Sequence, residues 1–134
     1  MLRKSIKKVL CSGILVLTVF AASNVTFARL GTINSMNDIM PTSTGFSGWS
    51  QTDECKVSAS QVDWIQTYYY LYKDGASYAQ AYTTSPNSTQ ARGTFKYNYT
   101  GPKAVFSIDT YGSARYVDGS TDSDFVRNAC MAGK

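Results

Sequence analysis

The sequence contains no histidine. This absence removes the usual general base near neutral pH, the Ser-His-Asp and Cys-His arrangements of nucleophilic catalysis, and the commonest metal ligand. Glycine-rich phosphate loops, dinucleotide-binding fingerprints and the GxSxG nucleophile motif are missing as well. Only carboxylates remain for acid–base chemistry, and a single glutamate is among them. We therefore expect a protein that is not an enzyme and that uses no metal or other cofactor.

The chain also lacks an apolar run of about 20 residues, the length needed to span a bilayer as a helix. The longest run, residues 9–22, follows a start that carries four basic residues within eight positions. Thr26 and Ala28 then place small residues at the −3 and −1 positions of a cleavage site. This arrangement is typical of a secretory signal peptide. We expect residues 1–28 to be removed, the protein to be secreted, and the mature chain to insert into no membrane.

Excess charge is lacking once that segment is removed. The whole chain has 13 Lys and Arg against 9 Asp and Glu. Subtracting the four basic residues of the signal leaves nine of each sign, interspersed along the mature chain. A neutral domain has no electrostatic footprint for nucleic acid or for an anionic membrane surface. We expect neither as a partner.

Cysteine is sparse, with three in the chain. Cys11 lies in the signal, so Cys55 and Cys130 remain after export. An even count in an exported chain predicts one disulfide between them. The predicted organisation is then a loosely ordered segment over 29–54, with at most one or two helical turns, and an antiparallel β-domain over 55–134.

Two hairpins are predicted within that β-domain. Residues 62–72 are rich in aromatic and β-branched side chains, which favour strands, and Asp74-Gly75 is suited to a tight turn. A two-residue turn there pairs Tyr72 with Ser77, Tyr70 with Ala79 and Tyr68 with Ala81.

The second hairpin is predicted around Gly101-Pro102. Residues 94–100 and 103–109 both alternate in polarity, and one register places Tyr97 beside Phe106. Several short strands separated by turn signals predict a small all-β fold, an antiparallel sandwich or barrel.

Tyrosine is the compositional outlier, with ten residues, all in the mature chain. Most of them are accounted for by strand packing with the hydroxyl at the rim. The functional interpretation is an aromatic platform on one sheet face, suited to sugar rings, peptide or a partner protein. We assign Tyr69, Tyr78 and Tyr82 to this exposed binding face, because Tyr68 and Tyr70 lie over alanines in the predicted hairpin.

A second candidate site is the acidic loop that contains Asp118, Asp122 and Asp124. Three carboxylates within seven residues offer oxygen ligands for Ca²⁺, but their spacing differs from that of an EF-hand. A solvated loop with Asx-turns explains the same residues. We favour the solvated loop, with a calcium site as the alternative.

The function predicted from these features is non-catalytic binding at an extracellular surface, to a glycan, a cell wall or a protein. The alternative is a secreted antimicrobial, bacteriocin-like toxin, which small size, export and a rigid disulfide would permit. Neutral charge and the lack of a cationic amphipathic helix weigh against the toxin.

Overall fold

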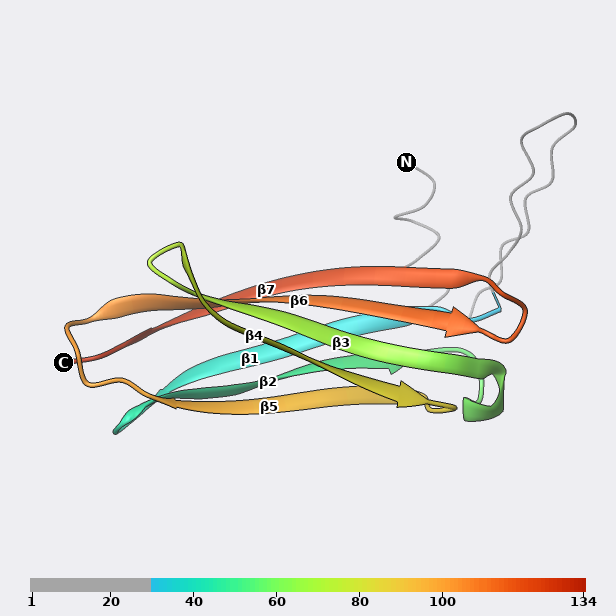
Figure 1. The fold of residues 1–134 in the computed structure, drawn as a ribbon, viewed down its shortest axis with the longest axis horizontal. Helices are drawn as coiled ribbons and strands as arrows, with labels where there is room; N and C mark the ends of the chain where they lie inside the picture. The colour runs from blue at the N-terminus through green and yellow to red at the C-terminus, as the bar shows by residue number, and fades with distance from the viewer. Residues whose placement is uncertain (1–29) are drawn as a thin grey trace, which may run out of the picture.

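The polypeptide folds into two antiparallel sheets packed face to face, as the ribbon in Figure 1 shows. A computed structural model describes residues 30–134, so the predicted signal peptide lies outside the described range. A 3₁₀ turn over Ala59–Gln61 is its helical element. No helix within residues 30–134 is long and apolar enough to cross a membrane. The strands are β1 (Ile33–Thr42), β2 (Gly45–Glu54), β3 (Val62–Lys73), β4 (Ala76–Pro86), β5 (Gln90–Asn98), β6 (Ala104–Tyr116) and β7 (Thr121–Ala132).

One sheet has three strands in the order β1-β2-β5, and the other has four in the order β4-β3-β6-β7. Every pairing is antiparallel. β1 lies against β7 and β6 at one side of the sandwich, and β5 lies against β3 and β4 at the other. The predicted all-β antiparallel sandwich is therefore confirmed.

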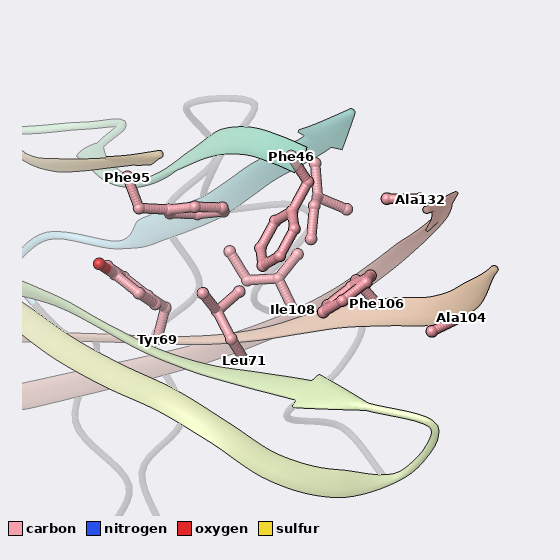
Figure 2. Close-up of a cluster of buried hydrophobic side chains, with 9 residues drawn as sticks. Phe46, Tyr69, Leu71, Phe95, Ala104, Phe106, Ile108 and Ala132 are labelled. Carbon is pink, nitrogen blue, oxygen red and sulfur yellow. The ribbon is translucent and has the colours of Figure 1, made fainter. Parts of the chain in front are cut away.

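The inward side chains form two hydrophobic clusters, one near each end of the long strands. Figure 2 shows the larger cluster, in which Phe46 from the three-stranded sheet stacks on Phe106 from the four-stranded sheet at 4.1 Å between ring centroids. The second cluster surrounds Val62, Ile65 and Tyr116 at the opposite end. Both rest on the alternation of strands, which sends every second side chain into the interior.

A layer of hydroxyl and amide groups separates the two clusters. Ser50 on β2 bonds to Thr67 on β3 at 2.5 Å and accepts a hydrogen bond from Thr110 on β6 at 3.0 Å. The Asn37 side chain on β1 donates to the Thr110 hydroxyl at 3.0 Å and to the Val126 carbonyl at 3.2 Å. These bonds join the two sheets, because the paired residues belong to opposite layers.

The expectation of a loosely ordered segment over 29–54 is wrong. Residues 33–54 form the β1–β2 hairpin, with Thr42 paired to Gly45 across the turn. The inward positions of these strands are largely small or polar, such as Ser35, Ser50 and Thr52. Because such residues stand between the buried apolar positions Ile33, Ile39 and Phe46, the segment lacks the alternating hydrophobicity that marks most strands.

The first predicted hairpin has the correct turn but the wrong register beyond it. Lys73 pairs with Ala76, and Tyr72 pairs with Ser77, as expected. A bulge next to Leu71 and Tyr72 then shifts the partners by one residue, so Tyr68 faces Tyr82 instead of Ala81. A bulge adds one unpaired residue to one strand and re-aims the side chains beyond it.

The second predicted hairpin is wrong. β5 pairs with β2, whereas β6 pairs with β3 and β7, so the two segments belong to different sheets. Their aromatic residues still meet, but across the interior: the Tyr99 and Phe106 rings are 5.0 Å apart. The alternation that satisfied a hairpin register also satisfies two strands that face each other in a sandwich.

The predicted disulfide between Cys55 and Cys130 is not formed. Cys55 follows the end of β2, beside the Glu54 carboxylate that binds Tyr116. Cys130 pairs with Phe106 near the start of β6, at the opposite end of the sandwich. The ten residue steps along β6 between these ends correspond to about 30 Å, far beyond the roughly 4.4–6.8 Å between Cα atoms that a disulfide allows.

Candidate ligand-binding face

Strand β3 presents three tyrosines to solvent. From Ile65 onward the strand alternates regularly: Ile65 and Leu71 are fully buried, and side chains an even number of positions from them also point inward. The alternate positions carry Tyr68, Tyr70 and Tyr72, which lie half-buried on the outer surface.

Neighbouring strands add three rings to the same outer surface. Tyr82 on β4 pairs with Tyr68, and Tyr111 on β6 lies between Tyr68 on β3 and Phe125 on β7. Tyr82, Tyr111 and Phe125 are 64%, 46% and 47% exposed. We call this surface the tyrosine face; its members are Tyr68, Tyr70, Tyr72, Tyr82, Tyr111 and Phe125.

The rings of the tyrosine face contact one another in a continuous series. Tyr68 stacks with Tyr82 at 5.9 Å and 10° between ring planes, and lies 4.7 Å from Tyr70. Tyr70 meets the edge of Tyr111 at 5.8 Å, and Tyr111 lies 4.8 Å from Phe125. These contacts link all four strands of the sheet and limit the rotation of each ring.

An open groove of about 890 Å³ follows the tyrosine face over β3, β6 and β7. These strands lie side by side in Figure 1. Besides five of the aromatic rings, the groove is lined by short polar side chains and one glycine: Gln66, Gly112, Ser113, Ser123 and Asp124. Gln66, Ser113 and Ser123 lie in one row across β3, β6 and β7, and Tyr68, Tyr111 and Phe125 lie in another.

The outer surface also carries an ion pair between the exposed Arg127 side chain and the buried Asp109 carboxylate. The Arg127 side chain donates two hydrogen bonds to the buried Asp109 carboxylate, at 2.5 and 2.6 Å. The same guanidinium lies 5.9 Å from the centre of the Phe125 ring. The Asp124 carboxylate, at the rim, accepts a hydrogen bond from the Ser35 amide at 2.8 Å. On this face Arg127 and Asp109 neutralise each other, and the Asp124 carboxylate is bonded to a backbone amide.

The pKa values of two phenols of this face, those of Tyr68 and Tyr72, are raised. A hydrogen bond with Tyr70 raises the pKa of Tyr68, and loss of hydration adds to this effect. Loss of hydration, followed by repulsion from the Asp109 carboxylate, raises the pKa of Tyr72. Both groups stay protonated well above neutral pH, so their hydroxyls can donate as well as accept hydrogen bonds.

Of the three tyrosines predicted for the exposed face, one lies on it. Tyr82 belongs to the tyrosine face. Tyr69 is 5% exposed and packs inside against Phe95 at 5.1 Å. Tyr78 is 37% exposed but turns inward at the bulge and packs against Phe46 at 5.7 Å.

The prediction missed the other members of the tyrosine face, although β3 contains the signal that identifies most of them. Ile65 and Leu71 lie an even number of positions apart, so their side chains lie on the same face of the strand. Because both are apolar, that face is the buried one. That parity places Tyr69 inside and Tyr68, Tyr70 and Tyr72 outside.

The acidic residues near the last turn do not gather into one site. Asp118 accepts hydrogen bonds from the amide and hydroxyl of Ser120 in its own loop. Asp122 accepts from the Thr32 hydroxyl at 3.1 Å and from the Ile33 amide at 3.2 Å. In the part of the chain that the structure describes, no group of three or more His, Cys, Asp or Glu side chains is placed to hold a metal ion.

Comparisons of the chain with protein families, with curated proteins and with solved structures give no match.

Proposed function

We propose that this protein is exported and acts without catalysis, by binding an uncharged extracellular glycan on its tyrosine face. The observation that carries the proposal is the gathering of six aromatic rings on one solvent-facing sheet surface. A β-sandwich can bury only one face of each sheet, so aromatic side chains on the outer face gain little for folding. Export is supported by the signal-like pattern of residues 1–28.

The chemistry of the groove favours a sugar over a charged ligand. The apolar side of a pyranose packs on flat aromatic rings, and its hydroxyls pair with phenol, amide and serine groups such as those of Tyr70, Gln66 and Ser113. The groove lining includes no lysine or arginine to bind phosphate, sulfate or a carboxylate, and the nearby Arg127 is paired with Asp109. An extended chain of neutral sugars fits an open groove that follows several strands.

The face is also organised before any ligand binds. Each ring of the tyrosine face contacts at least one other, which reduces the side-chain entropy lost on binding. Binding to preordered rings needs little rearrangement of the sheet.

The test is a panel of uncharged oligosaccharides, screened against the mature protein and followed by titration calorimetry on those retained. Tyr70→Ala and Tyr111→Ala should each weaken binding about tenfold or more, as expected for central aromatic contacts. The matched control is Trp49→Ala, which removes a large ring from the outer face of the other sheet, where Arg92 covers it at 4.6 Å.

Two outcomes would contradict the proposal. One is the absence of any bound neutral glycan at millimolar concentration. The other is loss of binding in Trp49→Ala while the two tyrosine variants, shown to be folded by circular dichroism, bind as well as the unsubstituted protein.

A further inference from the structure

Strand β4 is an unprotected edge of the four-stranded sheet. Its eleven residues pair with β3 on one side, and the sheet order places no strand on the other. The sequence Ala76–Pro86 contains no charged residue. Edge strands usually carry lysine, an inward charge or a covering element, because their free amide and carbonyl groups template pairing with another chain.

The other three edges of the sandwich are guarded. β5 presents Arg92 and Lys96 at exposed positions. β1 and β7 lie against each other, and β7 carboxylates bind β1 amides: Asp122 binds Ile33, and Asp124 binds Ser35. The contrast within one molecule distinguishes β4 from the remaining edges.

The arrangement of the sheets leaves the β4 edge accessible. β5, the edge strand of the other sheet, packs against the inner faces of β3 and β4, and the hydrogen-bonding edge of β4 has no strand beside it. In Figure 1, β4 begins at the β3–β4 hairpin, which projects from the body of the sandwich. Along β4 the outward side chains Gln80, Tyr82 and Thr84 are exposed.

We infer that a second copy of this chain pairs with β4 in antiparallel orientation, so that the two four-stranded sheets become one. A two-fold axis places β4 opposite itself, and an uncharged strand opposite itself brings no like charges together. In such a pairing Tyr82 becomes covered and the tyrosine faces of the two copies become continuous. This inference concerns the sheet edge and is independent of the ligand proposed above.

Sedimentation velocity of the mature protein over a concentration series tests the inference. Unsubstituted protein should form a dimer at high micromolar concentration. Gln80→Lys combined with Thr84→Lys should weaken that dimer at least about tenfold, because four added positive charges then meet at the joined edges. Thr94→Lys combined with Gln90→Lys is the matched control, since it adds the same charge on the exposed surface of the guarded β5 edge and should leave the dimer unchanged.

Hydrogen exchange provides an independent measurement. The β4 amides should exchange more slowly as protein concentration rises, whereas β5 amides should not respond. A protein that stays monomeric at several hundred micromolar would overturn the inference. So would a dimer that the β4 lysines leave intact, or one that both pairs of lysines weaken equally.

Discussion

At the scale of single residues, the described interior depends on polar side chains that are bonded across the two sheets. Ser50, Thr67 and Thr110 are completely buried and form one bonded group with Asn37. A buried hydroxyl without a partner costs about 1–3 kcal/mol, so each bond in this group matters for stability. The arrangement also selects one alignment of the sheets, because a shift of one residue would separate every donor from its acceptor.

Asp122 provides a test of these polar contacts. Asp122→Ala removes the acceptor for the buried Thr32 hydroxyl and the Ile33 amide. We expect the free energy of unfolding to fall by about 2–4 kcal/mol, measured by urea denaturation. Asp118→Ala, which affects only an exposed loop, serves as the control and should lower it by less than about 1 kcal/mol. Equal effects of the two substitutions would contradict the role given to Asp122.

The tyrosines predict an alkaline limit to stability. Burial, and then the neighbouring Tyr97, raises the pKa of Tyr69 in the folded protein, and the pKa values of Tyr68 and Tyr72 are raised as well. A raised pKa in the folded state means that stability is complete below the unfolded value near 10 and is lost as the pH rises above it.

Urea midpoints at roughly pH 9 and pH 11 check this limit. The midpoint should fall between them, and Tyr69→Phe should reduce the fall, since it removes one group whose ionisation is suppressed by folding. A midpoint that is constant over this interval would show that the phenols ionise as easily in the folded protein as in the unfolded chain.

At the scale of strands, β6 has a glycine that lies directly against side chains of the opposite sheet. A side chain at Gly112 would run into Ser35 on β1 and Thr52 on β2. Gly112→Ala should therefore destabilise the protein by about 1–3 kcal/mol through overpacking.

Gly93→Ala on β5 is the matched control for this substitution. Its added methyl group meets the Thr83 hydroxyl at 3.3 Å and a Tyr69 ring carbon at 3.5 Å, which small side-chain adjustments accommodate. Thermal denaturation of the two variants should separate them clearly. Similar melting temperatures would contradict the close approach at Gly112.

Strands with strong local signals were predictable, and their partners were less so. The Asp74-Gly75 turn was predictable because an Asp-Gly pair readily adopts positive φ angles, which are 49° and 82° here. The bulge beside Tyr72 carries no clear sequence signal, and it decides the partners of the remaining β4 residues. The segment 33–54 was missed because polar residues such as Ser35, Ser50 and Thr52 occupy many of its interior positions.

The same reasoning explains what could be predicted of the candidate site. An aromatic platform followed from composition, since one sandwich cannot bury ten tyrosines. Which tyrosines belong to the platform depends on which side chains of β3 point outward. Ile65 and Leu71 determine this, whereas the predicted hairpin pairs alone gave the wrong residues. Tyr111 and Phe125 lie on strands that are distant in sequence from β3, so only the sheet order brings them to the same surface.

At the scale of the whole molecule, the interior of the described domain consists of two separate apolar clusters, and the outer surface of its four-stranded sheet is aromatic. Two apolar clusters and the hydroxyl layer between them hold the sheets together without a bridge between Cys55 and Cys130. Loss of hydration raises the pKa of the Cys130 thiol, as expected for a side chain that packs beside the larger cluster. The outer surface of the four-stranded sheet is thus free to serve binding, since stability is supplied elsewhere.

The most direct test of this account is chemical-shift mapping of the mature protein with the uncharged oligosaccharide that it binds most tightly. The largest changes should fall on outward residues of β3, β6 and β7, centred on Tyr70 and Tyr111. Changes centred instead on Trp49 and Arg92, on the outer surface of the β1-β2-β5 sheet, would contradict the assignment of the tyrosine face as the binding surface.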